Sequence, residues 1–229
     1  MKLQSTIDAV LFDLDGTLVH TAPCIGAALN HALAEIHLGA IEPSVVVTMI
    51  GGGVPTLIER ALTKLGHAAD PPVVASMLAR YRAVYLAPNG PLPVAFPGVD
   101  GALTELHRAG FKLGVVTNTF DRFVQTILQI TGLAHLFDIV VSADTLPERK
   151  PHPAPLLYAC NALSVAPDQA LFVGDSRNDA EAAQAARIPM VCMTYGYNEG
   201  NPVSQLPALA FLANMSELPL LLAHRRVPR

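Results

Sequence analysis

Four short apolar runs, each followed by polar residues, constrain the fold of this 229-residue chain more than any other feature. A short apolar run that ends at a turn or polar residue predicts a buried β-strand. Ligands of open α/β sheets bind in the crevice outside the C-terminal ends of the strands. We therefore expect a sheet with an active site at that edge, built from residues 9–12, 112–118, 139–141 and 171–173.

Helical patterns alternate with these strands in the second half of the chain. Alternation at this spacing predicts βαβ units and a parallel sheet. The predicted helices lie at 99–108, 121–131, 154–163 and 179–187, and a last strand is predicted at 190–192.

The segment after the first strand is different, because only helical patterns occur in it, at 21–37, 43–50, 54–65 and 71–87. A passage rich in Pro and Gly, residues 88–98, follows and marks a linker. We therefore predict an α/β fold with a Rossmann-like parallel-sheet core formed by residues 1–17 and 95–229. An all-helical cap domain at 18–94 would be inserted into that core.

Two carboxylates, Asp13 and Asp15, follow the first predicted strand directly. Residues two apart on a continuing strand share a side, and two carboxylates there repel each other unless a cation or a proton lies between them. A calcium loop begins in a similar way but requires further oxygen ligands and a closing Glu, which the residues after Leu18 do not supply. The alternative is that both residues only form a turn and cap the next element. We interpret the pair as part of a site that carries out chemistry, and not as turn residues.

Composition and charge exclude several classes of function. Hydrophobic residues make up 51% and charged residues 15% of the chain, which is typical of a globular protein. The net charge of −4 argues against a surface that binds nucleic acid. No apolar segment reaches about 18 residues, so no membrane span is expected. The N-terminus lacks a signal-peptide pattern, which favours a cytoplasmic protein.

The three cysteines, Cys24, Cys160 and Cys192, are too few and too scattered for a disulfide framework or a zinc site. We expect them to be small core residues in a reducing cytoplasm. For the assembly we expect a monomer or a homodimer.

Four motifs occur in order along the chain. They are DLDGT, which begins at Asp13, then VVTN, RKP, and GDSRND, which ends at Asp179. In these motifs the chain resembles the haloacid dehalogenase superfamily of phosphohydrolases. The resemblance implies that Asp13 is the nucleophile, which would form an aspartyl phosphate. It implies that Asp15 is the general acid and base. Dehalogenases of the superfamily lack an Asp at this position, so Asp15 favours phosphate chemistry.

The same resemblance assigns the remaining polar residues of the motifs. Thr117, the amides near Asn118 and the Lys150 side chain would bind the transferring phosphoryl group. Asp13, the Asp15 carbonyl and Asp175 would hold Mg²⁺. Asp179 would orient Lys150 or a water on the metal. From the residues alone, Asp175 and Asp179 could equally cap a helix N-terminus.

The substrate is expected to be a small phosphorylated metabolite. The strings FPGV, DTLPERKPHPAPLL and TYGYN look like the bacterial phosphoglycolate phosphatases of the superfamily, which convert 2-phosphoglycolate to glycolate and phosphate with Mg²⁺. In the cap, Gly51, Gly52 and Gly53 precede a predicted helix, so their amides would either bind a substrate carboxylate or form a plain turn. His20 and Thr119 depart from the pattern of many relatives, and His20 would either contact the substrate or pack under the cap.

Other activities stay open at this point. One is a phosphatase of sugar phosphates, including an amino-sugar 6-phosphate, and another is a phosphoglucomutase-like transferase. A third is a non-catalytic phospho-receiver protein, which also places an Asp at a strand end. A receiver requires neither Asp15 nor the fourth motif nor a cap.

Overall fold

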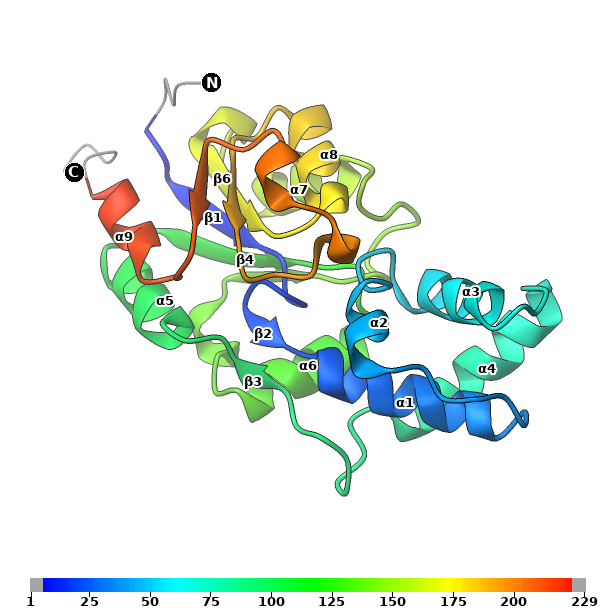
Figure 1. The fold of residues 1–229 in the computed structure, drawn as a ribbon. Coiled ribbons are helices and arrows are strands. Elements are labelled where there is room, and N and C mark those ends of the chain that lie inside the picture. Colours follow the sequence, from blue (N-terminus) through cyan, green and yellow to red (C-terminus); the bar gives the residue numbers. More distant parts are fainter. Residues whose placement is uncertain (1–5, 224–229) are drawn as a thin grey trace.

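Six parallel strands form the central sheet of the protein, whose computed structural model describes residues 6–223 (Figure 1). The strand order is β5-β4-β1-β6-β7-β8. Their bounds are β1 Ala9–Phe12, β4 Lys112–Val116, β5 Ile139–Val141, β6 Ala170–Gly174, β7 Met190–Met193 and β8 Ala210–Leu212. The central strand β1 pairs in parallel with β4 on one side and β6 on the other. The chain winds outward through β4 and β5, then in the other direction through β6, β7 and β8. The reversal lies beside β1, where such sheets bind ligands.

Helices cover both faces of this sheet. Side chains alternate along each strand, so the apolar residues of one strand point to both faces and pack against helices on each. Val10 and Phe12 of β1 belong to the core packed with helices α5 (Val99–Arg108), α6 (Asp121–Ile130) and α9 (Glu217–Leu222). Ala9 and Leu11 belong to the core packed with α7 (Ala154–Ala162) and α8 (Arg177–Ala186). The predicted α/β class with a parallel sheet is confirmed.

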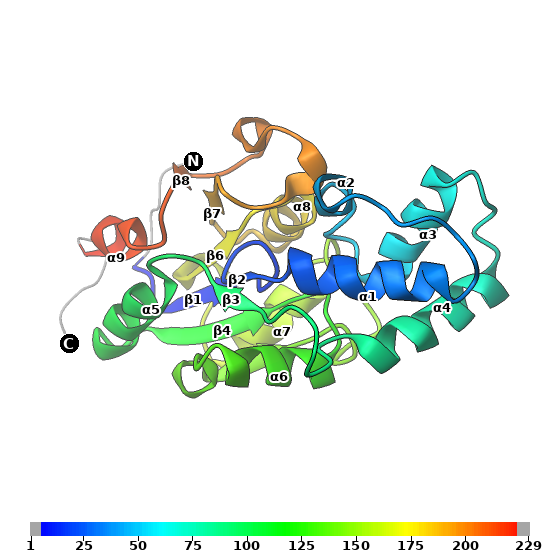
Figure 2. The same cartoon turned by 60° about the horizontal axis from the view of Figure 1, so that its bottom comes forward.

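The segment between β1 and α5 forms a helical insertion that projects from one side of the sheet (Figures 1 and 2). It contains α1 (Ala22–Ala34), α2 (Pro43–Val47), α3 (Val54–Lys64) and α4 (Pro71–Val84). An antiparallel pair of two-residue strands, β2 (Val19–His20) and β3 (Val94–Ala95), joins its two ends. The sequence analysis did not predict this pair. The division into a core of 1–17 and 95–229 and a cap of 18–94 stays a prediction.

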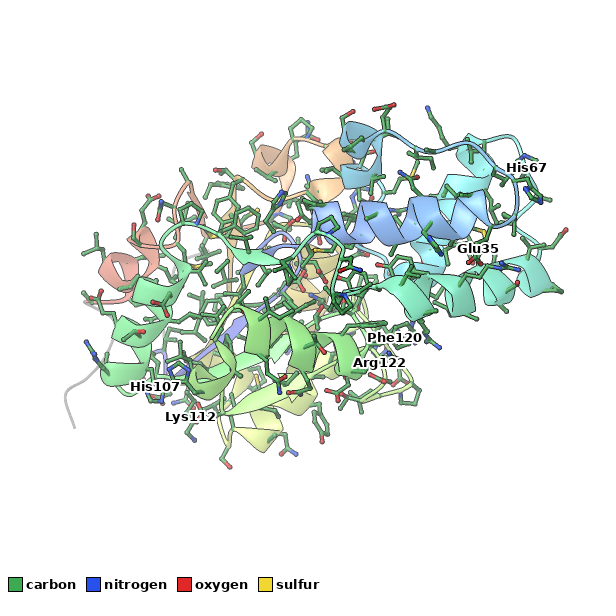
Figure 3. The ribbon with its side chains drawn as sticks, turned by 90° about the horizontal axis from the view of Figure 1, so that it is seen from below. Glu35, His67, His107, Lys112, Phe120 and Arg122 are labelled. Atoms are coloured by element: carbon green, nitrogen blue, oxygen red, sulfur yellow. The ribbon has the colours of Figure 1, made fainter. Side chains whose placement is uncertain are left out.

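Two arginine side chains of the insertion contact the sheet layer. Arg60 of α3 forms an ion pair of 2.7 Å with Glu199, which follows β7. The guanidinium of Arg82 in α4 stacks on the ring of Phe120, 4.0 Å from its centroid. Figure 3 shows Phe120 at the start of α6, beside the end of α4. These contacts place α3 and α4 over the strand ends.

Elements near the C-terminus depart from the prediction. Strand β8 and helix α9 were not predicted, and α8 begins at Arg177, two residues earlier than expected. Ser176 explains the early start, because its hydroxyl accepts a hydrogen bond from the amide of Asp179 as an N-cap. Within residues 6–223, no helix combines the length and the apolar character that a membrane crossing requires.

Candidate active site

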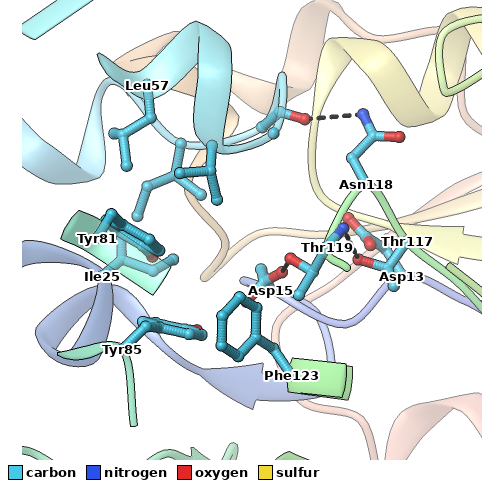
Figure 4. Close-up of a pocket in the computed structure, with 14 residues that line it drawn as sticks. Asp13, Asp15, Ile25, Leu57, Tyr81, Tyr85, Thr117, Asn118, Thr119 and Phe123 are labelled. Carbon is cyan, nitrogen blue, oxygen red and sulfur yellow. Dashed lines mark hydrogen bonds between the residues drawn. The ribbon is translucent and has the colours of Figure 1, made fainter. Parts of the chain in front are cut away.

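A pocket lies where the C-terminal ends of β1 and β4 meet the inserted helices (Figure 4). Its polar wall is formed by residues at the strand ends, and its other walls come mainly from α1, α3, α4 and α6. The lining residues are Asp13, Asp15, Ile25, Ile50, Gly51, Gly53, Val54, Leu57, Tyr81, Tyr85, Thr117, Asn118, Thr119 and Phe123. The structure therefore brings the first two motifs and two of the three predicted cap glycines to one cavity.

Asp13 is held in place by two donors to a single oxygen. Its Oδ1 accepts a hydrogen bond of 2.7 Å from the amide of Leu14 and lies 2.9 Å from Nζ of Lys150. Burial raises the pKa of Asp13 well above its ordinary value, and the negative charge of Asp179 adds to this, while Lys150 opposes it. Asp175 and Asp15 also raise this pKa, so three carboxylates act on Asp13 against the one ammonium of Lys150.

Lys150 connects Asp13 to Asp179. Its Nζ lies 2.7 Å from Oδ1 of Asp179, and the lysine is only 4% exposed. The backbone of Lys150 is fixed by Asn118, whose Oδ1 accepts from the lysine amide at 3.1 Å and whose Nδ2 donates to the lysine carbonyl at 2.9 Å. Although burial opposes the charged form, Asp13 and Asp179 raise the pKa of Lys150, so the ammonium keeps its charge.

Asp179 uses both of its oxygens within the protein. While Oδ1 binds Lys150, Oδ2 accepts from the Ser176 hydroxyl at 2.6 Å and from the amides of Ser176 and Asp175 at 3.0 and 3.2 Å. One side chain therefore takes part in capping the start of α8 and also binds the Lys150 ammonium, so the two roles that the sequence suggests for Asp179 are compatible.

Asp175 lies at the end of β6 and faces Asp13. Its Oδ1 accepts from the hydroxyl of Thr17 at 2.6 Å, and its Oδ2 accepts from the amide of Tyr197 at 2.7 Å. Burial and the charge of Asp179 raise the pKa of Asp175 to about 7. Gly196 packs directly on it, because a Cβ there would lie 2.0 Å from Cβ of Asp175.

Three carboxylates converge at this corner. One oxygen each from Asp13, Asp175 and Asp179 lies within 4.8 Å of the others. Hard oxygen donors in a buried, negatively charged corner match what Mg²⁺ prefers. The donor set therefore fits a divalent cation. Oδ1 of Asp179 is paired with the Lys150 ammonium and its Oδ2 accepts three hydrogen bonds, whereas each oxygen of Asp175 accepts one and Oδ2 of Asp13 accepts none from residues 6–223. Asp13 and Asp175 therefore keep more lone pairs for a cation.

Asp15 is turned toward two hydroxyl groups. The hydroxyl of Thr21 donates to its Oδ1 at 2.5 Å, and the hydroxyl of Thr119 donates to its Oδ2 at 2.6 Å. Burial raises the pKa of Asp15 above its ordinary value, and the two hydroxyls oppose this shift. A carboxyl group with a raised pKa in a fixed orientation is suited to proton transfer.

The sequence analysis predicts neither hydroxyl partner of Asp15. It leaves the role of Thr119 open, and in the structure the Thr119 hydroxyl donates to Asp15. Thr21 was not predicted as a site residue. It precedes α1, where a Thr ordinarily reads as a helix cap, yet it makes no capping hydrogen bond and binds Asp15 instead.

Thr117 and Asn118 directly follow β4 and line the pocket. The Thr117 side chain is buried, and its Oγ1 accepts from the amide of Thr119 at 3.2 Å. Nδ2 of Asn118 donates to the carbonyl of Gly51 at 3.1 Å, which joins the strand end to the insertion (Figure 4). Gly51 and Gly53 line the pocket, whereas Gly52 does not.

His20 lies outside this pocket. Its Nδ1 is 3.1 Å from the hydroxyl of Tyr197, and its ring lines a different cavity with Asn30 and Val46. The same tyrosine oxygen accepts from the amides of Thr21 and Ala22 at 3.0 Å. Tyr197 thus fixes the start of α1 and also binds Asp175 through its amide, a double role that nothing in its sequence position indicates.

Comparisons with known proteins agree with this geometry. The family model described as haloacid dehalogenase-like hydrolase matches residues 10–193. The chain is 38% identical over 216 residues to a protein named phosphoglycolate phosphatase from Thiobacillus denitrificans, covering 94% of this chain and 95% of that one. It is 41% identical over 213 residues to one from Cereibacter sphaeroides, covering 93% and 96%.

A solved structure has the same fold. It is a crystal structure of a predicted phosphoglycolate phosphatase from Haemophilus somnus, with a TM-score of 0.88 and 32% identity, covering 95% of this chain and 99% of that one. The resemblance inferred from the four motifs is therefore confirmed. The chain belongs to the haloacid dehalogenase-like hydrolases.

Proposed function

We propose that this phosphoric monoester hydrolase converts 2-phosphoglycolate to glycolate and phosphate, with Mg²⁺ and an aspartyl-phosphate intermediate. The observation that carries the proposal is the arrangement Asp13–Lys150–Asp179 facing Asp175, at the edge where the winding of the sheet reverses. The names of the relatives support the substrate.

Mg²⁺ would be held by Asp13, Asp175 and the carbonyl of Asp15. When bound, it supplies positive charge that offsets the carboxylates and the phosphoryl oxygens. The convergence of Asp13, Asp175 and Asp179 supports this assignment, because the Lys150 ammonium brings one positive charge to three carboxylates.

Asp13 would attack the phosphorus with Oδ2. Its Oδ1 is occupied by Leu14 and Lys150, while Oδ2 accepts no hydrogen bond from residues 6–223. As the oxygen–phosphorus bond forms, the bond from phosphorus to the leaving oxygen breaks. Lys150 and the hydroxyl of Thr117 would stabilise the charge on the transferring group.

Asp15 would move the proton in both half-reactions. In the first it gives a proton to the leaving glycolate oxygen, and in the second it takes one from the water that attacks the aspartyl phosphate. That attack releases phosphate and restores the Asp13 carboxylate. Thr21 and Thr119 would hold Asp15 in the orientation that both transfers require.

The test is phosphate release with Mg²⁺ from 2-phosphoglycolate, sugar phosphates, an amino-sugar 6-phosphate and p-nitrophenyl phosphate. We expect the highest kcat/KM with 2-phosphoglycolate, loss of activity in Asp13→Asn, and full activity in Asp70→Asn, which changes an exposed carboxylate of the insertion. A higher kcat/KM with a sugar phosphate would refute the substrate. Activation by a sugar bisphosphate with little phosphate release would indicate a mutase, and no turnover of any ester would indicate a receiver.

We further propose a cytoplasmic enzyme that acts as a monomer or homodimer on a small phosphorylated metabolite. The three cysteines support a reducing compartment, because all are free and buried. Light scattering coupled to gel filtration measures the assembly, and a trimer or larger species would contradict it.

A further inference from the structure

Tyr81 of α4 and Tyr85, which directly follows this helix, line the active-site pocket from the side opposite Asp13 (Figure 4). They are 1% and 7% exposed, and their rings stack with centroids 5.1 Å apart. The ring of Phe123 packs edge-on against Tyr85 at 4.7 Å. The rings are therefore fixed by packing, and they form the wall that the leaving group of a substrate would meet.

Neither hydroxyl has a hydrogen-bond partner among residues 6–223. A buried hydroxyl ordinarily finds one, because leaving water without a replacement bond is unfavourable. Within the same part of the chain, Arg80 Nε is the one fully enclosed side-chain atom without a partner. Both tyrosine oxygens therefore retain contact with open space, and the pocket is the open space that these side chains line.

The pocket offers neutral donors on this side. No Lys, Arg or His side chain is among its lining residues in the described chain. Burial raises the pKa of Tyr81 and of Tyr85 well above the ordinary value, and the charge of Asp15 adds to this. Both hydroxyls therefore stay protonated and able to donate.

The start of α3 adds backbone donors to the same pocket. Gly53 and Val54 line it, and no side chain caps this helix end. The first hydrogen bond of the α-helical pattern is the one that the amide of Leu57 donates to the carbonyl of Gly53. Amides left free at a helix start attract anions.

We propose that the hydroxyls of Tyr81 and Tyr85 bind the carboxylate of the leaving group and select small anionic phosphomonoesters. This inference rests on the proposed function, since it assigns the binder of the substrate's second anionic group. The aliphatic side chains of Ile25, Ile50 and Leu57 complete the wall and leave polar recognition to the two hydroxyls and the α3 amides.

The experiment compares 2-phosphoglycolate with ethyl phosphate, which has the same two-carbon leaving group without the carboxylate. Tyr81→Phe and Tyr85→Phe keep the ring packing and remove only the hydroxyls. We expect each variant to lower kcat/KM for 2-phosphoglycolate about tenfold, mainly through KM, and to lower kcat/KM for ethyl phosphate much less. Tyr158→Phe, which removes an exposed hydroxyl on α7, is the matched control.

Thermal unfolding separates a binding role from a structural one. Because neither hydroxyl bonds to the described protein, both variants are expected to keep the wild-type Tm or to exceed it. Equal losses with both substrates, together with a lower Tm, would overturn the inference and indicate a structural role. An unchanged preference in the double variant would also overturn it.

The substrate preference of the wild type tests the proposed function separately from the role of the two tyrosines. If it prefers a sugar phosphate to 2-phosphoglycolate, the substrate proposal fails whatever the tyrosine variants do. If it prefers 2-phosphoglycolate and the variants retain that preference, the substrate proposal stands and only the role of Tyr81 and Tyr85 fails.

Discussion

Replacing Asp175 by Asn removes one negative charge from the three converging carboxylates, and we expect the metal-free protein to become more stable above pH 7. The pKa of Asp175 is raised from its ordinary value of 3.8 to about 7, chiefly by burial and then by Asp179. Between these two pH values the folded state holds a proton that the unfolded state releases. The stability of the wild type therefore falls as the pH rises through this window.

The shift and the local hydrogen bonds set the size of the effect. A shift of about three pKa units corresponds to about 4 kcal/mol of stability lost by pH 8, and the variant avoids that loss. Asn keeps both hydrogen bonds if its oxygen accepts from the Tyr197 amide and its amide group donates to the Thr17 hydroxyl. The pKa of about 7 already includes the effect of both hydrogen bonds on the charged form, so they are not subtracted again. We therefore expect a gain of about 4 kcal/mol at pH 8, which disappears toward pH 4.

Urea unfolding with a chelator present, between pH 4 and pH 8, measures this difference. Asp70→Asn removes an exposed carboxylate and is expected to show no such pH dependence. With Mg²⁺ added, the wild type should gain stability and Asp175→Asn should gain much less. A stability difference between wild type and Asp175→Asn that is constant across the pH range, or a variant less stable than wild type at pH 8, would refute the reasoning.

Three further changes test other contacts. Asn118→Ala removes the hydrogen bonds to Lys150 and to Gly51, and we expect the free energy of unfolding to fall by about 3 kcal/mol in urea. A double-mutant cycle of Arg60→Met and Glu199→Gln should give a coupling below about 1 kcal/mol that weakens with salt, because the pair is partly exposed. Gly196→Ala forces a Cβ against Asp175 and should cost about 3 kcal/mol or more, whereas Gly101→Ala, in open space on α5, should not destabilise. A Gly196→Ala protein as stable as the wild type would contradict the packing around Asp175.

The sheet and the strand-end residues could be predicted from the sequence because their signals are local. Strand β1 is an apolar run that stops just before Asp13, and β4 is one that stops just before Thr117, so each of these motifs shows where its residues lie in the fold. Parallel pairing then brings such ends to one edge without further information. Lys150 follows from its motif, although only the structure shows that its ammonium group joins Asp13 to Asp179.

Contacts between distant elements could not be predicted in this way. Tyr81 lies on a helix with other apolar residues and reads as a core position, yet its hydroxyl is left without a described partner inside the pocket. The bond from Thr119 to Asp15 depends on the relative rotation of two strand ends, which no local pattern records. Strand β8 has three residues and β2 and β3 have two each, too short for a periodic signal.

The β2–β3 pair has a consequence for how this protein can change. Val19 lies opposite Ala95 and His20 opposite Val94, so the chain leaves and re-enters the sheet layer at neighbouring points. A two-residue turn between His20 and Val94 would close the pair as a hairpin and leave the order of the six strands intact. A helical insertion of another length could therefore replace this one at the β2–β3 pair, and the pocket wall that the insertion supplies would change with it. Because Thr21 lies just beyond this pair, the replacement would remove its hydrogen bond to Asp15 unless the new insertion also placed a hydroxyl there, whereas the Thr119 bond would stay with the sheet.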